Sequence, residues 1–511
     1  GEVSSESVIL ALSWSQDGSR LGLVSTQFDT GDRETATPFD GALIASLMYR
    51  DAVGSLPPDE NPLYTNNQAQ IYNLADGSQQ ALRAAGGDGS YYRGISWSTD
   101  GHNVLAHMFL PGHPAGHRYP SYNIQFASSS RFRFLAEDGH ETGRFNATQV
   151  SAVFANDAQF VTPDEVIFTA AQGTNVHPFY YNRVTGEFRR IADRDGSYLG
   201  VQATRLSRRI VFTYTSFTAP DDLYRQNWDG GALARLSWTG EELRQFSQTS
   251  EHNVTFRLRS GVTRQGVLIT PRDWEWPPRN RPIIVWQEGG PGPAMNSHWL
   301  AAVEAPFGLL PNFGFGLLVV PVAGRDGTGP GAFSMLANGR QFGQVDIDET
   351  AEIVRQITAR RWTTPHNVGI TGCSYGGYFT LQSIVRHPDL YGAANAQCSL
   401  VDVVVEWSRG YQTLIQHLEG PRTPFNDARE FQADSPIYNA NRIRTPLLLF
   451  KGTGDFLPVT QDENLLKLVQ DRGVPARMVK FAGEGHGLSN SENELYAAQE
   501  QIAWFRQYLH P

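Results

Sequence analysis

Two potential nucleophiles, Cys373 and Ser374, stand side by side between glycines in the sequence GITGCSYGGY. Either side chain can attack a carbonyl carbon once it is activated. The apolar sequences NVGIT before them and YFTLQSIVRH after them predict a strand followed by a helix. A residue at the apex of such a sharp turn has a strained backbone, so its neighbours two positions away, here Gly372 and Gly376, must be small. The spacing therefore selects Ser374 as the nucleophile and predicts that Cys373 is a small buried apolar residue.

A serine nucleophile needs a base and a carboxylate that orients this base. His486 lies in a glycine-rich loop after the apolar sequence ARMVKFAG, and Asp455 comes just after the buried-strand sequence TPLLLFKG. The order Ser, Asp, His along the chain, with the last two on loops after late strands, is that of the α/β-hydrolases. We therefore expect Ser374, Asp455 and His486 to form a catalytic triad.

The other acidic residues after the nucleophile fit structural roles better, because none directly follows a buried strand. We interpret three of them as helix caps or surface residues: Asp402, Asp434 and Asp462. The second cysteine, Cys398, ends the next predicted strand and receives the same interpretation as Cys373. Two cysteines do not make a disulfide framework.

An oxyanion hole requires two N–H donors beside the nucleophile. The first is usually the N–H of the residue that follows the serine, here Tyr375, at the positive end of the following helix. The second usually comes from the loop after an early strand. The sequence VWQEGGPGPAM, residues 285–295, is such a loop, and Gly289 is our candidate for the second donor.

These residues belong to the second of two regions with different patterns. From about residue 250 onward, unbroken apolar runs such as FGLLVVPVAG alternate with helical stretches such as DETAEIVRQITARRW. Strands that are apolar on both faces, with helices between them, indicate a mostly parallel sheet covered by helices on both sides. We expect an α/β-hydrolase domain over residues 248–511.

The first region consists of short alternating strands separated by turn signals. The sequence SWSQDGSRLGLVS at residues 13–25 recurs as SWSTDGHNVLAHM at residues 96–108. The offset between Trp14 and Trp97 in these repeats is 83 residues. This offset is about twice the length of one four-stranded β-propeller blade, which has about 45 residues. We therefore expect an all-β propeller over residues 1–247, with five or six blades by length. Such a propeller would be small or open, or would lack its first blades.

The composition excludes several classes of partner. The formal net charge of −10 argues against a nucleic-acid-binding surface. No run of about 18 apolar residues occurs, so we expect no membrane-spanning helix and no membrane partner.

Other features of the composition indicate little about function. Lysine occurs at three positions only, Lys451, Lys467 and Lys480, and the other 39 of the 42 basic residues are arginine, which we interpret as a coding bias. The chain begins at Gly1, without Met, so we expect a processed or engineered N-terminus. Periplasmic, secreted and cytoplasmic locations all fit, and the sequence does not indicate an oligomeric state.

Taken together, the motifs resemble those of the prolyl oligopeptidase family of serine peptidases, over nearly the whole chain. The resemblance rests on five stretches: GCSYGGY, GGPG at 289–292, GRDGTG at 324–329, SPIYNANRIRTPLLLFKGTGD at 435–455 and GEGHG at 483–487. It implies the same triad, a peptide substrate admitted under a propeller lid, and no metal or organic cofactor. Two branches fit, one similar to acylaminoacyl peptidases and one that opens the isopeptide bond of lasso peptides.

One departure from the family pattern lies in the oxyanion loop. Glu288 occupies the position where relatives carry Tyr or His before Gly-Gly-Pro. A carboxylate at this position would repel an oxyanion unless it is neutralised. We therefore expect Glu288 to face away or to pair with a cation such as Arg325, and both residues are candidates for substrate binding.

The family's substrate pocket is built partly after the strand that ends at Cys398. Trp407 and Tyr411 are candidate pocket walls, although packing against a helix would explain them equally well. The paired glutamates of the dipeptidyl-peptidase branch are not found, so that exopeptidase activity is not supported. Four histidines between residues 102 and 117 lie in a glycine- and proline-rich stretch, which favours a solvent-exposed loop over a metal site.

Three functions remain open. The first is a serine peptidase that acts on short or conformationally constrained peptides, with lasso isopeptide bonds as a special case. The second is an esterase with the same triad that acts on small acyl esters. The third is a non-catalytic binding protein built on the propeller. A propeller favours peptides, because size filtering matters little for small esters.

Overall fold

The computed structural model describes residues 7–27, 68–82, 91–111, 127–150, 152, 154–204, 207–337, 342–409, 415, 418–419 and 422–510. The chain divides into two compact units, which are described separately. The propeller unit comprises Gly1–Thr215, Asp221–Thr239 and Asp326–Ser334. The hydrolase unit comprises Ser216–Pro220, Gly240–Arg325 and Met335–Pro511. Both units therefore contain more than one chain segment, whereas the predicted domains meet at one point between residues 247 and 248.

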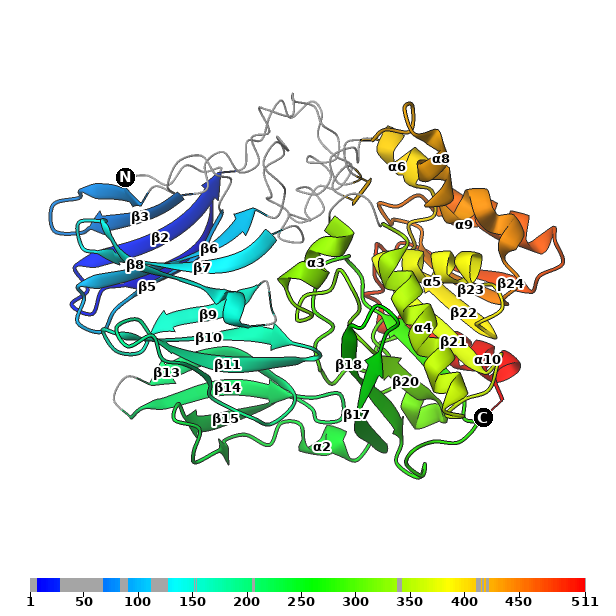
Figure 1. Cartoon of the computed structure of the whole chain (residues 1–511), viewed down its shortest axis with the longest axis horizontal. Coiled ribbons are helices and arrows are strands. Elements are labelled where there is room, and N and C mark those ends of the chain that lie inside the picture. Colours follow the sequence, from blue (N-terminus) through cyan, green and yellow to red (C-terminus); the bar gives the residue numbers. More distant parts are fainter. Residues whose placement is uncertain are drawn as a thin grey trace. The chain divides into compact units, whose positions relative to one another are not determined.

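The described strands of the propeller unit form two four-stranded antiparallel sheets and one eight-stranded sheet (Figure 1). In the eight-stranded sheet, a parallel pairing of β11 with β13 joins two antiparallel groups of four strands, so each group is described below as a blade. The first blade has β1 (Ser7–Trp14), β2 (Arg20–Gln27), β3 (Gln68–Asn73) and β4 (Gln79–Leu82). The second has β5 (Tyr91–Trp97), β6 (Asn103–Pro111), β7 (Ala127–Ala136) and β8 (Glu141–Asn146), followed by the short 3-10 helix η4 (Ala147–Gln149). The third has β9 (Ala155–Phe160), β10 (Glu165–Gln172), β11 (Asn175–Asn182) and β12 (Phe188–Arg190). The fourth has β13 (Ser197–Thr204), β14 (Arg209–Thr215), β15 (Asp222–Asn227) and β16 (Ala234–Arg235).

The predicted propeller architecture is confirmed, and the described ranges contain four blades rather than five or six. The difference arises because the first blade extends from residue 7 to residue 82, well beyond the roughly 45 residues of a typical blade. The repeated sequences SWSQDG and SWSTDG form the same tight turn in the first two blades. In each turn a glycine N–H, at Gly18 or Gly101, donates to a serine carbonyl three residues earlier at 3.0 Å.

The stretch with four histidines departs from the expected loop. His107 lies inside β6, where it is buried between the rings of Phe109 and Phe132, at centroid distances of 5.2 and 5.1 Å. Burial lowers its pKa to about 3, so it is neutral. His102 lies in the turn before β6 and pairs with Glu137, while residues 113 and 117 lie outside the described residues. The loop interpretation is therefore wrong for His107.

The hydrolase unit contains one eight-stranded sheet with the order β17-β18-β20-β19-β21-β22-β23-β24. Its strands are β17 (Thr249–Arg257), β18 (Thr263–Pro271), β19 (Ile283–Gln287), β20 (Gly316–Val319), β21 (Val368–Cys373), β22 (Ala393–Gln397), β23 (Leu447–Gly452) and β24 (Ala476–Phe481). β17 and β18 are antiparallel to their neighbours, and the pairs from β20 to β24 are parallel. This arrangement confirms the predicted mostly parallel α/β-hydrolase sheet.

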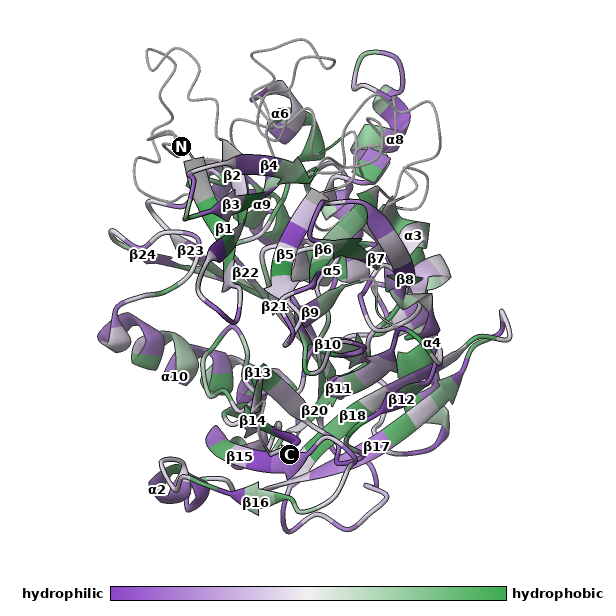
Figure 2. Ribbon diagram, turned by 90° about the vertical axis from the view of Figure 1, so that its left-hand side faces the viewer, coloured by the Kyte–Doolittle hydropathy of each residue, from purple (hydrophilic) through white to green (hydrophobic). Residues whose placement is uncertain are grey.

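Helices and short 3-10 helices precede, connect and follow these strands. They are α2 (Glu241–Arg244), η5 (Leu310–Phe313), α3 (Pro330–Ala337), α4 (Val345–Ala359), α5 (Tyr375–Arg386), α6 (Val403–Ser408), α8 (Ala428–Ala433), η6 (Pro436–Arg442), α9 (Val459–Gln470) and α10 (Ser491–Tyr508). α10 carries both hydrophilic and hydrophobic residues (Figure 2), and its apolar residues Ala497 and Phe505 are buried. None of the helices in the described part of the chain is long and apolar enough to cross a membrane.

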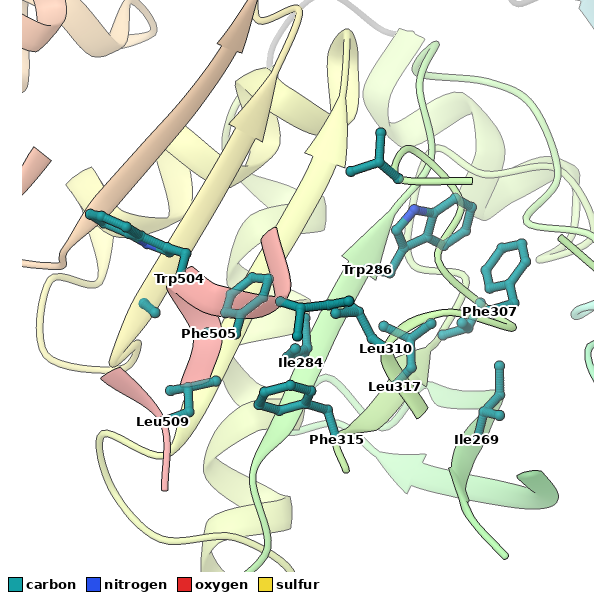
Figure 3. Close-up of a cluster of buried hydrophobic side chains, with 14 of the residues drawn as sticks. Ile269, Ile284, Trp286, Phe307, Leu310, Phe315, Leu317, Trp504, Phe505 and Leu509 are labelled. Atoms are coloured by element: carbon teal, nitrogen blue, oxygen red, sulfur yellow. The ribbon is translucent and has the colours of Figure 1, made fainter. Parts of the chain in front are cut away.

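The core of the hydrolase unit lies beneath the strand that leads into the oxyanion loop (Figure 3). Ile284 and Trp286 of β19 belong to one buried cluster with Phe307 and with Phe505 of α10. The Trp286 ring meets Phe307 edge-on at a centroid distance of 4.7 Å, and its Nε1 donates to the Glu304 carbonyl at 2.7 Å. Burying a large apolar side chain contributes about 1.5–3 kcal/mol. This cluster therefore gives the loop after β19 a rigid base.

Candidate active site

Ser374 occupies the turn between β21 and α5, at φ 60° and ψ −118°. Such a left-handed conformation is strained for a residue other than glycine, and it persists only where the surrounding structure holds it. A Cβ atom at Gly372 or Gly376 would come within 3.0 Å of the Gln287 carbonyl oxygen. The two glycines thus allow β19 to pass close to the turn, as the spacing predicted, and the Ser374 side chain stands at the carboxyl edge of the sheet.

Asp455 and His486 follow the neighbouring parallel strands β23 and β24. Asp455 Oδ1 lies 2.8 Å from His486 Nδ1 and accepts a hydrogen bond from the Leu457 N–H at 3.0 Å. The Asp455 side chain is fully buried, and 28% of the His486 side chain is exposed. Asp455 therefore fixes Nδ1 as the protonated nitrogen of the imidazole, which leaves Nε2 as the nitrogen with basic character.

The His486 loop lies directly against the serine turn. The Cys373 Sγ is 3.9 Å from the His486 carbonyl oxygen. Within the described ranges, Ser374 Oγ makes no hydrogen bond to another residue, so Ser374 and His486 are neighbours without a closed hydrogen bond between them. Apo active sites often show such loose pairs, which tighten when substrate binds.

Cys373 and Cys398 form a disulfide, with their Cα atoms 5.4 Å apart. The interpretation of both residues as separate buried apolar side chains is therefore wrong. β21 and β22 are adjacent parallel strands in which Cys373 pairs with Gln397, so Cys398, the next residue, lies beside Cys373. The Ser374 N–H donates to Gln397 O and also approaches Cys398 Sγ, both at 3.0 Å. The disulfide thus joins the serine turn to the end of β22.

The three aspartates interpreted as caps or surface residues differ in their surroundings. Asp402 caps α6, because its side chain accepts the Val405 N–H at 3.0 Å. Asp434 and Asp462 are buried, so the surface interpretation is wrong for both. Burial raises the pKa of Asp434 to about 7 and that of Asp462 to about 6.

The candidate oxyanion donors lie beside the nucleophile. Tyr375 is the first residue of α5, so its N–H belongs to the helix N-terminus. Gly289 is packed against the serine turn, since a Cβ atom there would lie 3.4 Å from Ser374 Cβ. However, the Gly289 N–H donates to Glu288 Oε1 at 2.8 Å. The carboxylate of Glu288 thus engages the donor that the sequence assigned to the oxyanion.

Arg325 holds the backbone of this loop. Its Nη2 donates to the Glu288 carbonyl at 2.7 Å, and its Nη1 donates to the Gly290 carbonyl. Burial raises the pKa of Glu288, and the charge of Arg325 opposes this rise. Of the two expected arrangements, Glu288 does not face away, and the charge of Arg325 acts on its carboxylate as the alternative expected. Arg325, with a fully buried side chain, also braces the backbone of the loop.

The sequence did not indicate a second carboxyl group under the serine turn. The Tyr375 hydroxyl donates to Asp346 Oδ2 at 2.6 Å, and the Arg325 guanidinium lies over the Tyr375 ring at 5.4 Å. Burial raises the pKa of Asp346 to about 6. The acidic first turn of α4 was the available signal, but nothing in the sequence pairs it with Tyr375.

Glu304 faces the histidine loop from the segment after β19. Its Oε1 lies 3.3 Å from the Leu488 N–H, and a Cβ atom at Gly487 would lie 3.1 Å from the same oxygen. Burial raises the pKa of Glu304, and the nearby His486 opposes this rise. Glu304 therefore supports the backbone next to His486.

The predicted pocket walls are partly within the described residues. Trp407 lies on α6, and its ring meets Phe425 edge-on at a centroid distance of 5.4 Å, while Tyr411 lies outside the described residues. Arg409 Nη2 donates to the Phe456 carbonyl at 3.1 Å. The Phe456 ring packs on the His486 ring at a centroid distance of 4.3 Å. The helix that carries Trp407 is thus tied to the loop that carries Asp455.

A β-propeller together with a mostly parallel sheet, whose carboxyl edge carries Ser374, Asp455 and His486, defines the class of propeller-bearing α/β-hydrolases. Residues 308–511 match the model of the prolyl oligopeptidase family. The chain therefore carries a prolyl oligopeptidase family domain, in agreement with the resemblance seen in its motifs.

Curated relatives support the same assignment. The chain is 26% identical over 302 residues to dipeptidyl aminopeptidase BIII of Pseudoxanthomonas mexicana, which covers 55% of this chain and 42% of the relative. It is 24% identical over 256 residues to the acylamino-acid-releasing enzyme of Rattus norvegicus, which covers 48% of this chain and 34% of the relative. The chain thus spans less than half of the length of these relatives.

Solved structures share the fold. A crystal structure of puromycin hydrolase superposes with a TM-score of 0.68 at 17% identity, over 97% of this chain and 69% of that one. The acylaminoacyl peptidase of Pyrococcus horikoshii superposes with a TM-score of 0.59 at 16% identity, over 98% of this chain and 88% of that one.

Proposed function

We propose that the chain is a serine peptidase whose nucleophile is Ser374, whose general base is His486 and whose orienting carboxylate is Asp455. One observation carries the proposal: the strained serine turn and the hydrogen-bonded Asp455–His486 pair lie at the same edge of one sheet. The family domain and the peptidase names of the curated relatives support it.

The proposed reaction proceeds through an acyl-enzyme. His486 Nε2 takes the proton of Ser374 Oγ as this oxygen attacks the peptide carbonyl, and then gives the proton to the departing amine. Water, activated by the same nitrogen, releases the acyl group. Asp455 stabilises the imidazolium that forms in each step. The Tyr375 N–H stabilises the oxyanion, and the Gly289 N–H joins it when the Glu288 carboxylate is displaced.

We propose peptide amides as the substrate class, and short or conformationally constrained peptides in particular. Two curated relatives are named as an aminopeptidase and an acylamino-acid-releasing enzyme, and both names describe the cleavage of peptide or acyl-peptide bonds. The propeller supports a restriction on substrate size. Within this class, lasso peptides, which are closed by an isopeptide bond, are the most constrained substrates that we propose.

The test combines a probe for the nucleophile with a substrate panel. A fluorophosphonate probe should label the wild-type chain and not Ser374→Ala, whereas Ser260→Ala, a change in the exposed turn between β17 and β18, should label normally. Aminoacyl, prolyl and acyl-peptide anilides are then compared with p-nitrophenyl esters. Turnover of esters alone would overturn the peptidase proposal, and absence of labelling would favour a binding protein. Conversion of a threaded lasso peptide to its linear form would assign the isopeptidase activity.

A further inference from the structure

Lys451 stands behind the proposed triad, within β23. It is one of three lysines in the chain, and its side chain is fully buried. Its Nζ lies 3.1 Å from Asp455 Oδ2 and 3.2 Å from Asp462 Oδ2, and it donates to the Ser399 carbonyl at 3.4 Å. A buried ammonium is stable only with such partners.

Above the pKa of Asp462, which burial raises to about 6, the contacts form an uninterrupted row of alternating charge. Asp462, at the start of α9, contacts Lys451, Lys451 contacts one oxygen of Asp455, and the other oxygen of Asp455 contacts His486. All three ion-pairing side chains are fully buried, so water screens their mutual interactions little. The charge at one end of the row therefore acts on the imidazole at the other.

We infer that Lys451 and Asp462 are positioning residues that set the basicity of His486 through Asp455. The inference rests on the proposed triad. The Lys451 cation holds Asp455 in place and partly cancels its charge, which alone would weaken His486 as a base. Asp462 offsets this effect, because it pairs with the same ammonium and adds one negative charge beside the Lys451–Asp455 pair.

Other charged groups face this row and are not substituted in the test. Glu304 faces His486 from the segment after β19, with Glu288 near it. Glu406 faces Lys451 from α6 and is ion-paired with Arg409 at 2.9 Å. Among the described residues, Asp462 forms its ion pair with Lys451 and with none of these groups. A change at Asp462 therefore reports on the row itself.

The decisive measurement is the titration of the His486 imidazole by NMR in 15N-histidine-labelled protein, with His486→Gln used to assign the signal. Asp462→Asn removes one negative charge and keeps the side-chain shape. The charge near the imidazole becomes more positive, which disfavours the imidazolium, so the pKa of His486 should fall by about one unit. The double variant Lys451→Met with Asp462→Asn removes one charge of each sign, and it should return the pKa to that of the wild type.

The double variant also separates electrostatics from packing. Replacing a buried ion pair by apolar or neutral residues of similar volume is often neutral for stability, and circular dichroism checks the fold of each variant. A merely structural role predicts no shift in Asp462→Asn, or the same shift in the single and double variants. Either result overturns the inference, and the Asp462→Asn result decides it even if the double variant does not fold.

Kinetics supply the matching readout. The acid limb of the rate of fluorophosphonate labelling should move to lower pH in Asp462→Asn, with a plateau about threefold lower. If the wild-type chain is not labelled at all, the proposed peptidase function fails, whereas the NMR shift still tests the charge row. The two failures are therefore distinguishable.

Discussion

Cys373 is joined by a disulfide to Cys398, so the residue directly before the proposed nucleophile is covalently attached to the neighbouring strand β22. The serine turn is thereby held at two points, since the Ser374 N–H also donates to the Gln397 carbonyl at 3.0 Å. A covalent link at this position restrains the segment that must keep Ser374 in a left-handed conformation.

Reduction of this disulfide should destabilise the protein. The bond links residues that are 25 positions apart, and a loop of this size contributes about 3 kcal/mol to the free energy of unfolding. Urea unfolding should therefore shift to lower concentration in the presence of a phosphine reductant. The double variant Cys373→Ala with Cys398→Ala should unfold at one midpoint in both conditions. Equal midpoints for the wild type, with both thiols free by thiol titration, would contradict the expectation.

The close approach of β19 to the serine turn makes a second prediction. A methyl group at Gly376 would come within 3.0 Å of the Gln287 carbonyl oxygen, which is backbone and cannot swing away. Gly376→Ala should therefore lower the free energy of unfolding by about 2 kcal/mol or more and abolish fluorophosphonate labelling. Gly331→Ala is the matched control, because a Cβ atom at that position meets nothing within 4 Å. Normal labelling of Gly376→Ala would show that the turn is less constrained than its geometry indicates.

The sequence was sufficient for the fold class, and it predicted that the three candidate catalytic residues lie at one edge of a sheet. Ser374 and Asp455 each follow a buried strand, and His486 follows the partly exposed edge strand β24. The carboxyl ends of these parallel strands meet at one edge of the sheet. Chain order and strand order therefore placed them together without knowledge of any contact. The strand repeat of the propeller was predictable because the first two blades share the same turn sequence.

Features that depend on contacts between distant segments were not predictable from the sequence in the same way. The disulfide requires the register of β21 against β22, and the pairing of Lys451 with Asp462 requires α9 to pack behind β23. The sequence showed Asp462 only as an acidic residue near a helix start, where surface exposure is the usual outcome. The contact of the Glu288 carboxylate with the Gly289 N–H depends on the side-chain conformation, which residue spacing does not determine.

The contact between the Glu288 carboxylate and the Gly289 N–H predicts that turnover becomes faster when the charge of Glu288 is removed. A carboxylate at 2.8 Å from this donor competes with the oxyanion and repels it. Glu288→Gln removes the charge and should raise kcat by about tenfold. Because burial raises the pKa of Glu288, the wild type should lose activity as this group ionises with rising pH. The variant should lack that decline.

The pH profiles of kcat for the wild type and for Glu288→Gln, measured on one acyl-peptide anilide, check this expectation. Glu304→Gln serves as the comparison, since its carboxylate contacts the Leu488 N–H rather than the oxyanion loop. A fall in turnover in Glu288→Gln would show instead that the carboxyl group takes part in binding the substrate. An unchanged rate and pH profile would exclude both roles.

Asp346 predicts a pH dependence of stability. Its pKa is raised by burial from 3.8 to about 6 in the folded protein, so between these values the folded state binds more protons than the unfolded state. Stability contributed by this group is therefore present at low pH and is lost as the pH rises from about 4 to about 6, by up to about 3 kcal/mol. Asp346→Asn keeps an acceptor for the Tyr375 hydroxyl but cannot ionise. Relative to the wild type, this variant should gain stability over that interval, as measured by urea unfolding at a series of pH values. A difference in the free energy of unfolding that stays constant from pH 4 to pH 7 would show that Asp346 keeps its ordinary pKa, and that the charge of Arg325 fully compensates its burial.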